Sequence, residues 1–152
     1  ISLDENIVNI LVINGPNLNM LGNRDSEYYG TKTLHDSLEY CRGTSEILCV
    51  SISTFQSNSE GDIVRYIQDN ATNSAGIVIN AGALTHYGYA LSDALADSRL
   101  PVVEVHISNV YAREEYRSKS VLSALAIGQV AGLGWRGYGY ALELIVQHLK
   151  GI

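Results

Sequence analysis

Short apolar runs alternate with amphipathic segments along the chain. The apolar runs predict five strands, at residues 7–14, 46–55, 75–80, 101–106 and 125–133. Apolar residues at helical spacing predict helices at residues 33–42, 60–71, 89–98 and 138–149. Near-continuous apolar strands that alternate with helices are typical of a parallel sheet covered on both faces. The pattern therefore predicts an α/β protein.

Five strands in a chain of 152 residues favour one arrangement of that sheet. We expect a single flavodoxin-like domain over residues 1–152, doubly wound, with its five parallel strands in the order 2-1-3-4-5. Apolar residues make up 46% of the chain, which is enough to build a core. The sequence contains no internal repeat, linker or low-complexity segment that would divide it.

Polar or glycine-rich segments follow every predicted strand. In an open parallel sheet, ligands bind beyond the carboxyl ends of the strands, and these ends share one edge. The segments begin at Asn14, Gln56, Asn80, His106 and Gly132. Amides or histidine at four such ends are more than turn chemistry requires. We therefore expect a binding or catalytic site at this edge.

The loop after the first strand, residues 14–30, is long for a mere connection. A tyrosine is a poor base at neutral pH because its usual pKa is about 10, but neighbouring guanidinium groups favour the phenolate. Arg24 and Tyr29 of this loop could form such a pair. Alternatively, Tyr29 is an ordinary surface aromatic among ten tyrosines, and Asn17 belongs to a tight turn.

Glu104 and His106 lie on the same side of the fourth predicted strand, about 7 Å apart, because side chains alternate along a strand. A carboxylate there can hold one imidazole nitrogen and fix the tautomer. The other nitrogen then faces the edge of the sheet as a general acid or base. The alternative is a histidine with a purely structural role. Ser108 follows at the same edge.

Two further groups flank this edge. Arg113 and Arg117 are four residues apart and share one face of a short predicted helix, as a carboxylate clamp or as part of a salt-bridged surface turn. Thr85 could cap the helix after the third strand, and His86 could bind a carboxylate or hydroxyl. Asp93 is expected two turns beyond His86 on the same face, where it could serve a neighbouring subunit.

Composition excludes several classes of function. A net charge of −6 leaves no basic face for nucleic acid, and no apolar run has membrane length. The chain has no metal-ligand spacing, phosphate loop or nucleophile elbow. Cys41 and Cys49 are expected to be two buried free thiols. With no signal peptide evident, we expect a cytoplasmic protein that uses no metal or cofactor.

Several motifs resemble, in order, the signatures of type II 3-dehydroquinate dehydratases. They occupy residues 14–30, 55–61, 80–86, 104–109, 112–117 and 132–138, and the resemblance runs from about Val8 to Leu144. It implies a hydro-lyase of the shikimate or quinate pathway, and hence a link to aromatic amino acid biosynthesis. It also implies cofactor-free conversion of 3-dehydroquinate to 3-dehydroshikimate, and a flavodoxin-like subunit in a homododecamer built from trimers.

The resemblance also implies roles for the candidate residues. Tyr29 would remove a proton from C2, Arg24 would activate it, and Asn17 would hold a water against the enolate. His106 would protonate the departing C1 hydroxyl, with Glu104 orienting it. Arg113 would close the lid, and Asp93 would reach a neighbouring subunit's site. The residues that would hold the substrate are Asn80, His86, Ile107, Ser108 and Arg117.

The chain departs from the family pattern at a few positions, which are Tyr87-Gly88, Ser92, Tyr111 and Ala124. A histidine is common where Tyr111 stands, and an arginine usually occupies the place of Ser92. None of these departures removes a proposed catalytic group. The competing hypothesis is a non-catalytic flavodoxin-like module for a flavin or nucleotide, which the fold permits but the missing phosphate loop disfavours.

Overall fold

A parallel five-stranded sheet lies at the centre of the computed structural model, which describes residues 7–151. The strands are β1 (Asn9–Asn14), β2 (Ser51–Gln56), β3 (Gly76–Asn80), β4 (Val102–His106) and β5 (Gly128–Ala131). Their order is β2-β1-β3-β4-β5, and every neighbouring pair is parallel. The predicted α/β class and strand order are therefore confirmed.

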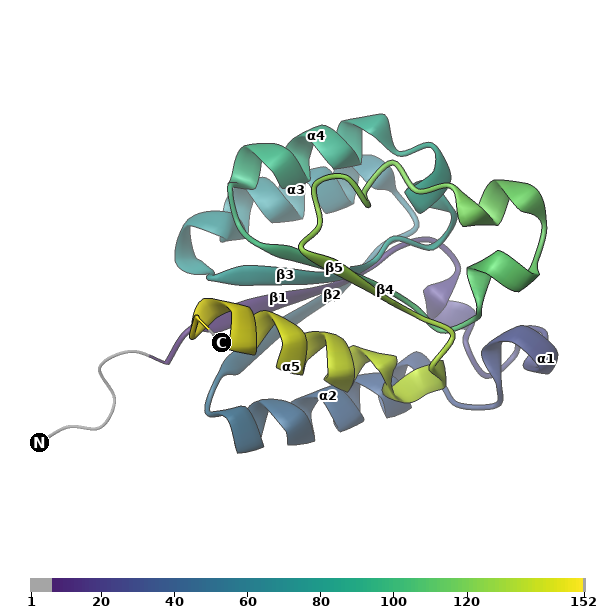
Figure 1. Ribbon diagram of the computed structural model, residues 1–152, viewed down its shortest axis with the longest axis horizontal. Coiled ribbons are helices and arrows are strands. Elements are labelled where there is room, and N and C mark those ends of the chain that lie inside the picture. The colour runs from purple at the N-terminus through teal and green to yellow at the C-terminus, as the bar shows by residue number, and fades with distance from the viewer. Residues whose placement is uncertain (1–6, 152) are drawn as a thin grey trace, which may run out of the picture.

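Helices cover both faces of the sheet, which explains why the central strands are apolar throughout (Figure 1). On one face lie α2 (Leu34–Leu48) and α5 (Gly137–Leu149), and on the other lie α3 (Glu60–Asn70) and α4 (Tyr89–Ser98). Alternate residues of β1 enter different cores. Ile10 and Val12 pack on the α2–α5 side, whereas Leu11 and Ile13 pack on the α3–α4 side. Within residues 7–151, no helix is both long and apolar enough to cross a membrane.

The helix α2 is longer than the sequence predicts. It begins at a capping box between Thr33 and Asp36, continues through Gly43, and ends at Leu48, so residues 46–48 are helical and not part of a strand. A glycine inside a helix costs about 1 kcal/mol relative to alanine, and contact with α5 offsets this cost. A Cβ at Gly139 of α5 would lie 2.5 Å from the Tyr40 ring of α2, so glycine permits this close approach.

Two smaller predictions are also wrong. Cys41 is buried, but Cys49 is exposed, because it lies just beyond α2 at a left-handed residue that ends the helix at the surface. Both thiols are free. The strand β5 covers only Gly128–Ala131, because a turn precedes it and glycine at φ +80° follows it at position 132.

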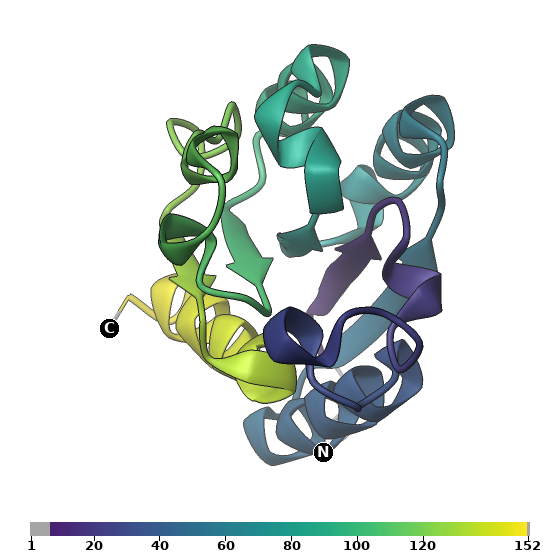
Figure 2. The same ribbon diagram turned by 90° about the vertical axis from the view of Figure 1, so that its right-hand side faces the viewer.

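The segments after β1 and β3 approach each other closely at the carboxyl edge of the sheet. The Gly15 amide donates to the Asn80 carbonyl at 2.8 Å, and a Cβ at Gly15 would lie only 2.3 Å from the carbonyl oxygen of Ala81. Glycine is therefore required at this crossing. Seen from this edge, the loop after β1 and its short helix α1 (Ser26–Tyr29) lie in front of the strand ends (Figure 2).

Candidate active site

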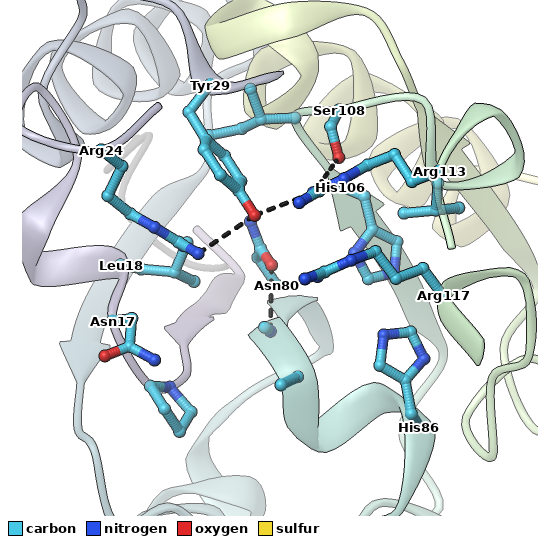
Figure 3. A pocket seen from close by; sticks show the side chains of 15 residues that line it. Asn17, Leu18, Arg24, Tyr29, Asn80, His86, His106, Ser108, Arg113 and Arg117 are labelled. Atoms are coloured by element: carbon cyan, nitrogen blue, oxygen red, sulfur yellow. Dashed lines mark hydrogen bonds between the residues drawn. The ribbon is translucent and has the colours of Figure 1, made fainter. Parts of the chain in front are cut away.

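A cavity of about 170 Å³ opens at the carboxyl ends of the strands (Figure 3). All the residues predicted for the site line it, except Glu104 and Asp93. The sequence did not single out the remaining lining residues, which are Pro16, Leu18, Gly82, Ala83 and Val110. Segments that follow β1, β3 and β4 thus meet where the strand pattern placed the site.

Tyr29 projects from α1 into this cavity between two arginines (Figure 3). Its hydroxyl oxygen accepts hydrogen bonds from Arg24 Nη2 at 3.0 Å and from Arg113 Nη1 at 2.8 Å. The Arg24 guanidinium carbon also lies 3.9 Å from the centroid of the Tyr29 ring. Two cations at the oxygen stabilise negative charge on it, so the geometry suits a phenolate.

The short helix α1 determines which of two adjacent tyrosines enters the cavity. The Asp25 side chain caps the helix by accepting from the Glu27 amide at 3.0 Å, and Gly30 ends it at φ +69°. Tyr29 consequently points inward. Tyr28 remains exposed and does not line the cavity; its ring lies 4.1 Å from the Arg113 guanidinium carbon.

Glu104 and His106 extend from β4 on the same side, as predicted. His106 Nε2 lies 3.1 Å from Glu104 Oε1, although the N–H direction is poor for a hydrogen bond. Glu104 has no exposed surface, and His106 retains 6%. Burial tends to raise the pKa of Glu104, but contacts from His106, Ser120 and Thr85 outweigh it and hold the pKa at about 2. A buried carboxylate therefore stands behind the imidazole.

Thr85 does not have the role predicted for it. Its hydroxyl donates to Glu104 Oε1 at 2.6 Å, and no side chain caps α4, which begins one residue after Gly88. His86 ends a separate 3₁₀ turn, so it does not share a helical face with Asp93. Asp93 is exposed on α4 and does not line the cavity.

His86 has a defined tautomer. Its Nδ1 lies 2.7 Å from the carbonyl oxygen of Lys119, and a carbonyl can only accept, so Nδ1 carries the hydrogen. The ring also makes an edge contact with Tyr116, with 5.4 Å between centroids. In the neutral ring, Nε2 is left as an acceptor for a hydroxyl in the cavity.

Arg113 and Arg117 both line the cavity, but not from one helix. Arg113 has an extended backbone between two 3₁₀ turns, and Arg117 lies in the second of them. Arg113 Nη1 bridges Tyr29 to the Ser108 hydroxyl, 3.1 Å away. Arg117 pairs with Glu114, so the surface ion pair and the cavity position coexist.

Tyr138 is a site component to which the sequence assigned no chemistry. It is fully buried on α5, and its hydroxyl donates to Asn14 Oδ1 while accepting from Asn80 Nδ2 at 3.0 Å. Burial raises the pKa of Tyr138, so the hydroxyl stays neutral and can donate. The Gly82 amide donates to Asn80 Oδ1 at 3.1 Å. Because the Nδ2 group of Asn80 uses one of its two hydrogens in the bond to Tyr138, the other hydrogen is left for a ligand. The available signal was a tyrosine hydroxyl among the apolar residues on the buried face of this amphipathic helix.

Asn17 is held at the rim by the segment after β2. Its backbone is left-handed, with φ +69°, and its amide donates to Asn58 Oδ1 at 3.0 Å. Gln56 Nε2 donates to the Gly15 carbonyl at 3.2 Å. Within residues 7–151, no group of three or more histidine, cysteine or carboxylate side chains could hold a metal ion.

Comparisons with known proteins identify the family. Residues 8–146 match the protein family described as dehydroquinase class II. The chain is 52% identical over 141 residues to a protein of Halothermothrix orenii named 3-dehydroquinate dehydratase, covering 93% of this chain and 95% of that one. A protein of Deinococcus radiodurans with the same name is 49% identical over 142 residues, covering 93% and 99%.

Solved structures with a similar fold belong to the same family. The type II dehydroquinase of Butyrivibrio crossotus superposes with a TM-score of 0.87 at 44% identity, covering 91% of this chain and 97% of that one. The type II dehydroquinase of Propionibacterium acnes gives 0.86 at 41% identity, covering 91% and 96%. The similarity in sequence and in fold therefore extends over nearly the full length of these relatives.

Proposed function

The chain belongs to the dehydroquinase class II family, and on this premise we propose that Tyr29 and His106 are the base and the acid of its dehydratase reaction. The enzyme is a hydro-lyase of the shikimate pathway that dehydrates 3-dehydroquinate. The observation that carries the proposed mechanism is the pair of arginine hydrogen bonds to the Tyr29 oxygen.

Tyr29 removes a proton from C2 of the substrate, next to the C3 carbonyl, and an enolate forms. Arg24 and Arg113 hold the phenolate before the transfer and keep the oxygen in place after it. Asn17, at the rim of the cavity, holds a water against the enolate oxygen. This water stabilises the transition state at the oxygen on which negative charge develops.

His106 gives a proton to the C1 hydroxyl, which leaves as water and completes the enone. Glu104 remains ionised at neutral pH because its pKa is about 2, and its charge stabilises the imidazolium form of His106 until the proton moves. Tyr29 and His106 line the same cavity from different segments, so one substrate ring can reach both.

The remaining lining residues hold the substrate. Asn80 offers an amide hydrogen, His86 offers Nε2, and Arg117 supplies a positive charge for the carboxylate. Ile107 and Ser108, at the end of β4, complete the wall, and Ser108 also anchors Arg113 as the lid closes. No cofactor takes part in this mechanism.

The assembly is part of the proposal. Residues 1–152 act as one catalytic domain in a cytoplasmic homododecamer built from trimers, as the family resemblance implies. The exposed position of Asp93, away from its own cavity, leaves it free to reach a neighbouring subunit's site. Sedimentation at the mass of a monomer would contradict both the dodecamer and this role for Asp93.

The reaction is tested by mixing the purified chain with 3-dehydroquinate and following ultraviolet absorbance. The product is a conjugated enone, so absorbance should rise with time and in proportion to enzyme. Borohydride added with substrate should not inactivate the enzyme, because no Schiff base to lysine forms. A flat trace, or a yellow flavin-containing preparation, would favour a non-catalytic binding module instead.

A further inference from the structure

Neutral donors from several segments surround the carboxylate of Glu104. Thr85 and Ser120 each donate to Oε1 at 2.6 Å, and Ser120 also lies 3.0 Å from Oε2. Ser123 lies 3.3 Å from Oε2, and Gln129 Nε2 lies 2.9 Å from the same oxygen. Within the described part of the chain, His106 is the only ionisable side chain that pairs with Glu104. The charge of Glu104 is therefore directed at His106.

Gln129 reaches Glu104 because β4 and β5 pair in register. Glu104 stands directly beside Gln129 in that pairing, so their side chains share one face of the sheet. On the far side of the amide, the Tyr111 hydroxyl lies 2.7 Å from Gln129 Oε1. These contacts form a chain from Tyr111 through Gln129 and Glu104 to His106.

The chemistry of these groups fixes the direction of each hydrogen bond. An ionised carboxylate only accepts, so the NH₂ group of Gln129 must face Glu104. The Gln129 oxygen then faces Tyr111, whose hydroxyl must donate. Tyr111 thus selects the amide orientation that suits the carboxylate. With the amide reversed, two oxygens would oppose each other.

We propose that Gln129, oriented by Tyr111, is a positioning residue that sets the basicity of the Glu104 carboxylate behind His106. This inference rests on the proposed role of His106 as general acid. Gln129 donates to Oε2, while Thr85 and Ser120 hold Oε1, the oxygen that lies beside His106. As a donor, it also draws negative charge away from the imidazole, so that His106 releases its proton readily.

Neither residue touches the substrate, because neither lines the cavity. Tyr111 is 62% exposed, and Gln129 lies on the edge strand. Any effect on the reaction must therefore pass through Glu104. The ionisable groups that share the cavity with His106 stay the same in variants of this pair; they are Arg24, Tyr29, His86, Arg113 and Arg117.

The test is Gln129→Met, which keeps the length of the side chain but removes its amide. The freed carboxylate becomes more basic and binds the imidazolium more tightly. We expect kcat to fall about 10-fold at unchanged KM, because general acid catalysis contributes ~10²–10⁴-fold and only part of it is lost. The alkaline limb of the pH profile should move upward by about 0.5–1 pH unit.

Two further variants complete the experiment. Tyr111→Phe removes only the outer hydrogen bond from an exposed side chain, so it remains a test even if Gln129→Met fails to fold. Tyr111→Phe should lower kcat and move the alkaline limb of the pH profile upward, as Gln129→Met does, but each by a smaller amount. Gln147→Met is the matched control, since Gln147 donates to the surface carboxylate of Glu143 at 3.3 Å, and it should change neither quantity.

A second readout does not depend on turnover. The His106 imidazole can be titrated by NMR, and its midpoint should lie at higher pH in Gln129→Met than in the wild type. An unchanged midpoint and pH profile would overturn the inference, even if stability fell, because a merely structural residue would behave in that way. If the wild type did not dehydrate 3-dehydroquinate, the proposed function would fail, while the titration would still decide the positioning role.

Discussion

Arg113 donates a hydrogen bond to the hydroxyl oxygen of Tyr29, 84 residues away in sequence, at 2.8 Å. This contact joins the loop after β1 to the segment after β4 across the cavity. The same guanidinium nitrogen holds the Ser108 hydroxyl at 3.1 Å. Arg113 therefore holds the Tyr29 oxygen in place, and in the proposed mechanism it also stabilises negative charge on that oxygen.

Arg113→Lys tests this double role. Lysine keeps the positive charge but lacks the planar fork that reaches both Tyr29 and Ser108, so the phenolate loses a fixed donor. We expect kcat to fall about 10²-fold, the typical effect of removing one preorganised donor to a developing charge. Steady-state kinetics measure it, with Arg65→Lys on the exposed face of α3 as the control. Full activity in Arg113→Lys would mean that charge alone suffices.

Tyr29→Phe tests the base itself, and Tyr28→Phe is its natural control. The two tyrosines are adjacent, but only Tyr29 lines the cavity and bonds Arg24 and Arg113. Loss of the hydroxyl should lower kcat by roughly 10²–10⁴-fold, whereas Tyr28→Phe should stay near the wild type. Circular dichroism checks that both variants fold. If turnover persists in Tyr29→Phe, another group removes the proton.

Tyr138→Phe tests whether a buried hydroxyl orients Asn80. The change keeps the ring in the core but removes the bonds to Asn14 and Asn80, so that the Asn80 amide keeps only its bond from the Gly82 backbone and is held less firmly. We expect KM to rise about 5–10-fold and stability to fall by about 1–3 kcal/mol, the cost of leaving buried polar groups unpaired. Kinetics and urea denaturation measure the two effects. Tyr140→Phe, on the same helix but 41% exposed, should show neither.

The parallel α/β sheet and the edge that carries the site could be predicted from the sequence because both follow from local patterns, and the strand order then follows from the doubly wound arrangement that five strands in a chain of this length favour. Apolar runs such as residues 9–14 must be buried on both faces, and parallel strands bring their carboxyl ends to one edge. The spacing of Glu104 and His106 likewise fixes their common side. These features need no knowledge of distant contacts.

Other features depend on contacts between segments far apart in sequence, which no local pattern encodes. The helix α2 continues through Gly43 because α5 packs against it, with Gly139 allowing the approach. Thr85 donates a hydrogen bond to Glu104 instead of capping α4, because the pairing of β3 with β4 brings the Glu104 carboxylate beside it. Arg113 reaches the cavity from an extended backbone that the i,i+4 pattern could not anticipate.

We expect the stability of the fold to depend on pH through Glu104. The pKa of Glu104 is about 2 in the folded protein, compared with an ordinary value of 4.5. A lowered folded pKa contributes stability that is fully present above about pH 4.5 and is lost as the pH falls toward 2. At about 1.4 kcal/mol per pKa unit, the contribution is on the order of 3 kcal/mol.

Glu104→Gln isolates this contribution, because the amide keeps the shape of the carboxyl but does not titrate between pH 2 and 5. Asp36 and Glu114 also have lowered pKa values, and they are unchanged in the variant. Urea denaturation at pH 7 and pH 3 should therefore show a larger loss of stability for the wild type than for Glu104→Gln. Equal losses of stability in the two proteins would mean that the donors around Glu104 do not favour its charged form. The electrostatic role proposed for Glu104 behind His106 would then be contradicted as well.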